Sequence, residues 1–194
     1  MTSAQPALRA VALSKAYGKR LAVDHLDLQV DRGELFGFLG PNGAGKTTTI
    51  RMALGLIAPT NGSVEILGLD VRHNRAKVLP RVGALVESPA LYSYLSGRNN
   101  LRAFGDLLGG VPAKRIDEVL EIVSLTGRDK DKVKTYSMGM KQRLGLAVAL
   151  LNDPDLLILD EPRTVWIPRA SSRCAICCAP SPRRARRCSF PATC

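Results

Sequence analysis

The chain has 194 residues, a length that suits one domain with a core of its own. Hydrophobic residues make up 45% of it, and no stretch reaches the run of about 18 apolar residues that a transmembrane helix needs. Residues 1–10 lack the basic start and the apolar run of a signal peptide. These features argue against a membrane-spanning or secreted protein, and we expect a cytoplasmic location.

Basic residues and cysteines are concentrated at the end of the sequence. The net charge is +11, but residues 163–194 hold seven Arg and no Lys, Asp or Glu, which leaves +4 for residues 1–162. All five cysteines lie in the same segment, where Cys174 and Cys177 have CxxC spacing without the second pair or the His that a zinc site would need. The composition therefore changes at about Arg163.

Short apolar segments predict strands in the first part of the chain. Alternating apolar and polar residues over 26–30 predict a half-buried strand, and the continuous apolar run over 35–39 predicts a buried one. We expect a helix over about 46–55 and, after a turn, a strand at 64–66. These segments have the lengths and spacing of an α/β fold.

Residues from about 88 to 140 are expected to form helices. Apolar residues at i, i+3, i+4 and i+7 over 116–123 predict an amphipathic helix with Pro112 in its first turn. Another helix begins near Ser137, and an apolar strand over 156–159 follows it. The expected buried stripe of that second helix consists of Met140, Leu144, Ala147, Val148 and Leu151. Strands alternating with helices indicate an α/β domain with a mostly parallel sheet and an inserted helical subdomain.

Residues 40–47 carry a complete P-loop pattern, Gly-Pro-Asn-Gly-Ala-Gly-Lys-Thr. Small residues let successive backbone N–H groups point at phosphate oxygens, and the N-terminus of the following helix adds partial positive charge. We expect Lys46 to reach the β- and γ-phosphates and Thr47 to ligate Mg²⁺. A chance Gly-rich turn is the alternative, which the strand before and the helix after disfavour. The predicted nucleotide-binding residues are Gly40, Pro41, Asn42, Gly43, Ala44, Gly45, Lys46, Thr47 and Thr48.

Two carboxylates follow the apolar strand at 156–159. Ligand sites of α/β proteins lie at the carboxyl ends of strands, so Asp160 is placed to hold Mg²⁺ through water and Glu161 to polarise an attacking water. Taken alone, four apolar residues before Asp-Glu fit an ordinary strand end better. Together with the P-loop, they predict a metal-binding Asp160 and a catalytic Glu161.

Residues 136–143 read Tyr-Ser-Met-Gly-Met-Lys-Gln-Arg and open a helix upstream of Asp160. This segment resembles the signature of the ATP-binding subunits of ABC transporters, usually Leu-Ser-Gly-Gly-Gln. Ser137 and Gly139 match that pattern, whereas Met138 and Met140 depart from it. The resemblance implies that Ser137 and the exposed N–H groups contact the γ-phosphate of ATP held by the other subunit. Without the other motifs, a Ser N-cap on an amphipathic helix would be the better interpretation.

Two more positions fit the same family. Tyr17 lies where the family places an aromatic residue that stacks on adenine, although a surface or core tyrosine fits its position equally well. Glu87 lies where most members carry a Gln that contacts Mg²⁺ and senses the membrane partner. Glu at this position, like residues 91–98, resembles the bacitracin-resistance and drug-export branch. A carboxylate can ligate Mg²⁺, so the resemblance implies Thr47, Glu87 and Asp160 as metal ligands.

The family resemblance extends over residues 5–162. It implies a P-loop NTPase core with a mixed, mostly parallel sheet, an N-terminal antiparallel β part and a helical subdomain at about 88–140. It also implies ATP hydrolysis with Mg²⁺ in a homodimer or heterodimer on the inner face of the cell membrane. That dimer would drive a transmembrane permease and export a drug, antibiotic or peptide, and no nucleic-acid partner is expected.

Residues 163–194 depart from the family. Members normally continue after Asp-Glu-Pro with Thr-Asn-Gly-Leu-Asp-Pro, and later have a strand that ends in Ser-Ser-His. Residues 163–194 can be encoded by codons that, when read in a shifted frame, give Asn-Gly-Leu-Asp-Pro and Ser-Ser-His. We therefore hypothesise a frameshift near codon 163, a domain incomplete at its C-terminus and a non-homologous, disordered tail. A genuine basic tail for nucleic acid or anionic lipid is the competing interpretation.

Two other functions stay open at this point. The chain could be a remnant that binds nucleotide weakly without turnover, because the γ-phosphate-sensing His and the segment after Glu161 are missing. It could also be an ABC ATPase that acts on nucleic acid, although such proteins usually carry two such domains or a coiled-coil insertion. An ATPase assay distinguishes an active transporter subunit from a remnant.

Overall fold

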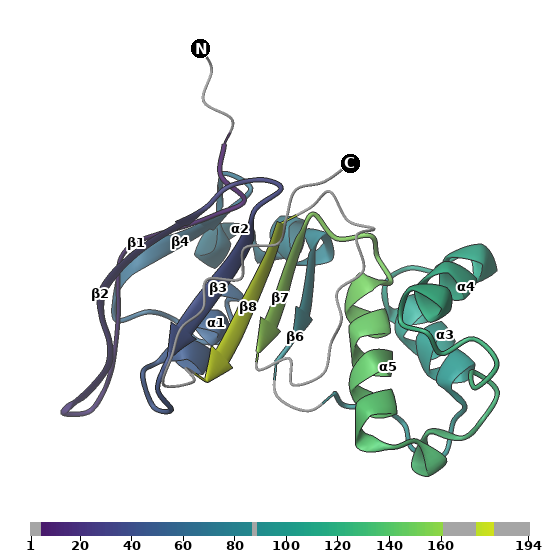
Figure 1. Cartoon of the computed structure of the whole chain (residues 1–194). Coiled ribbons are helices and arrows are strands. Elements are labelled where there is room, and N and C mark those ends of the chain that lie inside the picture. The colour runs from purple at the N-terminus through teal and green to yellow at the C-terminus, as the bar shows by residue number, and fades with distance from the viewer. Residues whose placement is uncertain (1–4, 87–88, 161–173, 181–194) are drawn as a thin grey trace, which may run out of the picture.

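The computed structural model of the chain describes residues 5–86, 89–160 and 174–180, the last of these by their backbone alone. It contains two four-stranded sheets, one antiparallel and one parallel, and a group of helices beyond one edge of the parallel sheet (Figure 1). The mixed α/β class, the N-terminal antiparallel part and the inserted helices agree with the prediction from sequence.

The antiparallel sheet is built from the N-terminal strands. In pairing order these are β2 (Arg20–Val30), β1 (Leu8–Tyr17), β4 (Asn61–Ile66) and β5 (Leu69–Asp70). Leu8 lies opposite Val30 on β2 and opposite Ile66 on β4, and all three side chains are buried. The two-residue turn Gly18-Lys19 joins β1 to β2, with Gly18 at a φ of 58°.

The parallel sheet carries the strand that leads into the P-loop. In pairing order its strands are β3 (Leu35–Gly40), β8 (Cys174–Pro180), β7 (Leu156–Asp160) and β6 (Val82–Leu85). Every residue of β7 is buried, as its apolar sequence predicts. Because β3 and β7 run parallel to the strand between them, Gly40 and Asp160 end at the same edge of the sheet.

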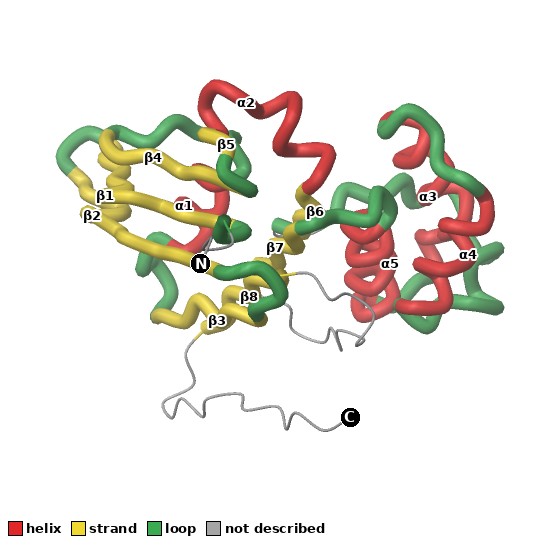
Figure 2. The backbone as a smooth tube through the Cα atoms, turned by 90° about the horizontal axis from the view of Figure 1, so that it is seen from above, coloured by secondary structure: helices red, strands yellow, loops and turns green. Residues whose placement is uncertain are grey.

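Helices pack between the sheets and beside them. The first half of the chain holds α1 (Lys46–Ala53), α2 (Val71–Val78) and the 3₁₀ turn η1 (Leu79–Arg81). The helical subdomain holds α3 (Gly97–Leu107), α4 (Ala113–Ile122), the 3₁₀ turn η2 (Val133–Thr135) and α5 (Met138–Leu150), and α5 runs past the end expected at about residue 140. Helices α3, α4 and α5 stand together on the side of β6, away from the antiparallel sheet (Figure 2).

Two hydrophobic clusters form the core. The first joins the antiparallel sheet to α1 and contains Leu13 and Met52. The second lies among the helices of the subdomain and contains Leu101 and Leu144. Strand β7 contributes to both clusters, because its alternate side chains face opposite sides of the sheet.

Three expectations about packing are corrected by the structure. Strand β3 is not fully buried: Leu35 and Leu39 are 53% and 48% exposed, because only the alternate residues Phe36 and Phe38 face the hydrophobic cluster around α1. Pro112 is the N-cap of α4 and precedes its first turn. In the predicted stripe of α5, Met140 and Val148 are only partly buried. The helix buries Leu146 and Ala149 outside that stripe, because it packs against β6 on one side and α3 and α4 on another.

Strand β8 lies in the segment for which the sequence predicted a disordered tail. It runs parallel between β3 and β7, with Cys178 in register with Phe38 on one side and Asp160 on the other. Composition gave no indication of this strand, because its backbone bonds to two neighbours and these bonds do not depend on side-chain type. The remainder of residues 163–194 lies outside the part of the chain that the structure describes.

Candidate functional site

The P-loop connects the end of β3 to the start of α1. Gly43 and Gly45 adopt φ values of 82° and 86°, a region that favours glycine. A Cβ atom at Gly45 would lie 2.4 Å from the carbonyl oxygen of Ala22 on β2, so no side chain fits there. The N-cap of α1, Gly45, makes no side-chain hydrogen bond, and the first N–H groups of the helix are available to an anion.

Lys46 places a buried ammonium group inside this loop. The residue is 6% exposed, and its Nζ donates hydrogen bonds to the carbonyl oxygens of Gly40 at 2.8 Å and Pro41 at 3.0 Å. No described carboxylate forms an ion pair with it. A buried positive charge whose described partners are carbonyl oxygens favours the binding of an anion, because these partners can be exchanged for phosphate oxygens.

Thr47 forms a hydrogen bond with Asp160 at one edge of the parallel sheet. The Thr47 Oγ1 atom donates a hydrogen bond of 2.9 Å to Asp160 Oδ2, although the two residues are 113 positions apart. Asp160 is 8% exposed at the end of β7, and Thr47 lies in the first turn of α1. A hydroxyl and a carboxylate oxygen at this distance are hard oxygen donors, so this pair fits a Mg²⁺ ion. The structure therefore brings together two of the predicted metal ligands.

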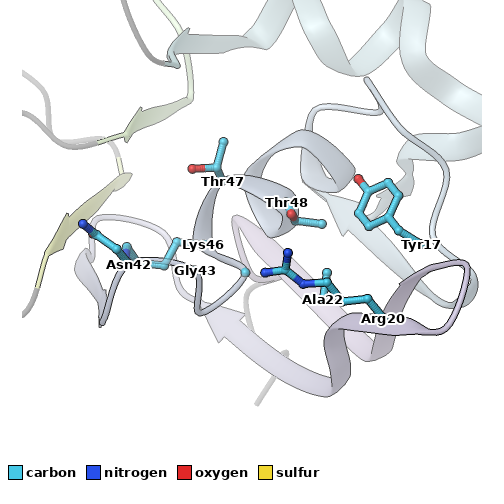
Figure 3. Close-up of a pocket in the computed structure, with 9 residues that line it drawn as sticks. Tyr17, Arg20, Ala22, Asn42, Gly43, Lys46, Thr47 and Thr48 are labelled. Atoms are coloured by element: carbon cyan, nitrogen blue, oxygen red, sulfur yellow. The ribbon is translucent and has the colours of Figure 1, made fainter.

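A pocket of about 460 Å³ opens beside the P-loop (Figure 3). This volume is in the range typical of sites for small molecules and cofactors, about 300–1,000 Å³. The residues that line the pocket are Tyr17, Arg20, Ala22, Asn42, Gly43, Gly45, Lys46, Thr47 and Thr48. Among the P-loop residues predicted from sequence, Gly40, Pro41 and Ala44 belong to the loop but do not line this pocket.

Tyr17 lies at the end of the pocket opposite the P-loop. The residue is 49% exposed, and the Nζ of Lys15 lies 5.2 Å from the centroid of its ring, within the range of a cation–π contact. Arg20 and Ala22 also line the pocket, and neither belongs to a motif that pointed to it in the sequence. The available signal was the Gly18-Lys19 turn, because a two-residue hairpin places Arg20 directly opposite Tyr17.

The two predicted signature residues lie away from this pocket. Ser137 is the N-cap of α5, and its Oγ accepts a hydrogen bond of 3.2 Å from the backbone N–H of Met140. Ser137 is exposed, and a Cβ atom at Gly139 would meet no atom within 4 Å. Neither residue lines the P-loop pocket of its own chain. The start of α5 is therefore an accessible helix N-terminus.

Two predicted site residues cannot be placed in this geometry. Glu87 and Glu161 both lie outside the residues that the structure describes. Within those residues, none of the helices has both the length and the apolar composition needed to cross a bilayer.

Comparison with known proteins identifies the family. The family profile described as "ABC transporter" matches residues 23–164. The chain belongs to the ABC transporter family. An uncharacterized ABC transporter ATP-binding protein, YhcH of Bacillus subtilis, is 55% identical over 143 residues, which cover 74% of this chain and 47% of that protein. The bacitracin transport ATP-binding protein BcrA of Bacillus licheniformis is 51% identical over 155 residues, covering 80% of this chain and 51% of the relative.

A solved ABC structure supports the fold independently. The structure of cbiO1 from Clostridium perfringens, part of the ABC transporter complex cbiONQ, has a TM-score of 0.78 at 23% sequence identity. The match covers 91% of this chain and 79% of that one. At this identity the likeness concerns the fold of an ABC ATP-binding subunit. The chain spans about half the length of the two curated relatives.

Proposed function

We propose that this chain binds and hydrolyses ATP with Mg²⁺ and thereby energises an ABC transporter. The observation that carries the proposal is the hydrogen bond between Thr47 and Asp160 at the edge of the P-loop pocket. This hydrogen bond joins the P-loop to the strand end that carries Asp160. A Mg·ATP site requires both motifs, which lie in distant parts of the sequence.

Substrate binding follows from the lining of the pocket. Tyr17 offers an aromatic face for adenine at one end, and the P-loop N–H groups offer donors for phosphates at the other. Lys46 exchanges its carbonyl partners, Gly40 and Pro41, for oxygens of the β- and γ-phosphates. These contacts fix the triphosphate in one orientation.

Hydrolysis requires charge neutralisation and an activated water. Thr47 and Asp160 would hold Mg²⁺, with Glu87 as a further ligand, and the ion when bound neutralises negative charge on the phosphates. Glu161 follows Asp160 directly in the sequence and would orient the water that attacks the γ-phosphate in line. Lys46 and the P-loop N–H groups stabilise the charge that develops on the phosphate oxygens.

The accessible start of α5 supports a dimer. Ser137 and Gly139 do not line the pocket of their own chain, and the helix start that they form has N–H groups that suit a phosphate. We infer that they complete the ATP site of a second ATP-binding subunit, identical or homologous. The permease would hold this dimer on the inner face of the cell membrane.

The transported substrate is inferred from relatives alone. BcrA of Bacillus licheniformis is described as a bacitracin transport ATP-binding protein and is 51% identical over the matched residues. This similarity favours export of a drug, antibiotic or peptide, with no nucleic-acid partner.

The proposal is tested by measuring Mg·ATP binding and phosphate release with the full chain and two variants. Lys46→Ala and Asp160→Asn should each lower turnover roughly 100-fold, because each removes a group that stabilises transition-state charge. Lys77→Ala is the matched control, since Lys77 is exposed on α2 and does not line the pocket. ATP binding without phosphate release in the unsubstituted chain would contradict hydrolysis and favour a nucleotide-binding remnant.

A further inference from the structure

Arg20 extends into the middle of the P-loop pocket. It is the cross-strand partner of Tyr17 in the β1–β2 hairpin, so the two side chains project from the same face of that ribbon. In Figure 3 its side chain runs from beneath the Tyr17 ring toward the P-loop, and the guanidinium group lies between Tyr17 and Lys46. Arg20 and Ala22, two residues apart on one strand, line the same pocket wall.

Among the described residues, none forms a hydrogen bond or ion pair with the guanidinium group of Arg20. Arg20 is exposed and makes no ion pair with another described residue. Other arginines are structural: Arg81 pairs with Asp155 at 2.7 Å, and Arg98 pairs with Asp129 at 2.7 Å. The hairpin register therefore sets the face from which Arg20 projects, and no ion pair with another described residue holds its guanidinium group elsewhere.

Lys15, the other cation close to Tyr17, already has contacts elsewhere. The Nζ of Lys15 lies over the ring of Tyr17 and donates a hydrogen bond of 2.7 Å to the carbonyl oxygen of Ala58. Lys15 therefore supports the aromatic ring, and it is absent from the lining of the pocket. Arg20 and Lys46 are the two charged side chains among the described residues that line it.

We propose that Arg20 binds the α-phosphate of the nucleotide, an inference that rests on the proposed ATP site. A nucleotide with its base on Tyr17 and its terminal phosphates at Lys46 has its ribose and α-phosphate between these two residues, where Arg20 points. A guanidinium group presents a fork of donors that matches two phosphate oxygens. Arg20 thus contributes equally to the binding of ATP and ADP, in contrast to a residue that contacts the γ-phosphate.

The test compares the affinities of the full chain for ATP and ADP after substitution of Arg20. Arg20→Ala should weaken both nucleotides by the same factor, roughly tenfold, because one charge-assisted contact is lost. Arg20→Lys should bind with intermediate affinity, since it keeps the charge but loses the fork. Lys19→Ala is the matched control: Lys19 carries the same charge in the turn next to Arg20, is exposed and does not line the pocket.

The outcomes separate this inference from the function on which it rests. If the unsubstituted chain does not bind ATP, the proposed function fails and the role of Arg20 fails with it. If that chain binds ATP and Arg20→Ala binds it equally well, the role of Arg20 is wrong and the ATP site stands. The role is also wrong if Arg20→Ala weakens ATP but not ADP, or if Arg20→Lys binds as weakly as Arg20→Ala. Thermal unfolding should be unchanged in all three variants, because exposed substitutions change stability by about 0.5 kcal/mol or less.

Discussion

A few polar side chains fix the loop that precedes Ser137 and α5. The Arg98 Nε atom donates to Asp129 Oδ2 at 2.7 Å, and its Nη2 atom donates to Asp117 at 2.6 Å. Asp129 is 6% exposed, and the hydrogen bond from Arg98 lowers the pKa of its carboxyl group below the ordinary value. The Tyr136 hydroxyl, whose pKa is raised by burial, donates to the backbone oxygen of Arg128 at 2.7 Å. The second half of the loop before α5 is therefore fixed by polar contacts at Asp129 and at Tyr136.

The Arg98–Asp129 pair predicts a loss of stability in acid. Because the pKa of Asp129 is lower in the folded than in the unfolded chain, its contribution is complete above the unfolded value of about 3.9 and disappears as the pH falls through the folded pKa. Asp129→Asn should lower the free energy of unfolding near neutral pH by about 1–3 kcal/mol and weaken its dependence on acid. Urea unfolding between about pH 3 and 7 measures both effects.

An exposed aspartate provides the comparison for this experiment. Asp106→Asn, on α3, should leave both the stability near neutral pH and the acid dependence close to those of the unsubstituted chain. If Asp129→Asn loses stability in acid as steeply as the unsubstituted chain, the pair is not the origin of that dependence.

At the scale of elements, the contact between β6 and α5 is close because glycines replace side chains on both. A Cβ atom at Gly83 on β6 would lie 2.1 Å from the carbonyl oxygen of Ala149. A Cβ atom at Gly145 on α5 would lie 2.6 Å from the Cβ of Pro89 and 3.0 Å from a methyl carbon of Leu85. Gly83 thus lets the backbone of β6 approach that of α5, and Gly145 leaves room on α5 for the side chains of Leu85 and Pro89.

Gly83→Ala is predicted to destabilise the protein by about 1–3 kcal/mol or more, because backbone atoms of α5 must move to admit one methyl group. Chemical denaturation measures the change in the free energy of unfolding. Gly139→Ala is the control for stability, since its Cβ meets no atom within 4 Å and alanine favours the helix by about 1 kcal/mol. Equal stability of the two variants would show that α5 and β6 are packed less closely than described.

Elements with a strong local signal were predictable, and those fixed by tertiary contacts were not. Helix α5 follows from the Ser137 cap and its apolar residues, and β7 from its run of four apolar residues. Helix α2 buries only Val71 and Val78, so its sequence shows no apolar stripe and the helix was missed. The exposure of β3 and the insertion of β8 depend on which elements cover or pair with them, and local sequence does not encode that information.

The residues of the candidate site likewise divide into those predictable from local sequence and those placed by tertiary contacts. The P-loop was predictable from its local pattern, because its glycines and the helix that follows determine where the N–H groups point. The contact of Thr47 with Asp160 was expected only by combining two motifs with the rule that sites lie at strand ends. Arg20 matched no motif, and its place in the pocket depends on the register of the β1–β2 hairpin.

At the scale of the whole molecule, β7 links the two hydrophobic clusters. Ile158 belongs to the cluster around α1, and Leu159 belongs to the cluster in the helical subdomain. Both side chains are at most 1% exposed. The strand that carries Asp160 at its end is therefore packed on both faces of the sheet. This arrangement implies that the two clusters unfold together.

Hydrogen exchange tests this coupling. Ile158→Ala and Leu159→Ala each remove buried methyl groups and should each lower the free energy of unfolding by about 2–5 kcal/mol. If the clusters unfold as one unit, either substitution raises amide exchange in both α1 and α4, because their slowest amides exchange through the same global opening. Leu107→Ala, at a side chain 76% exposed, should change exchange in neither helix. An increase confined to α1 for Ile158→Ala and to α4 for Leu159→Ala would show that the clusters open independently. The carboxylate of Asp160 would then be held by the α1 cluster alone whenever the helical subdomain opens.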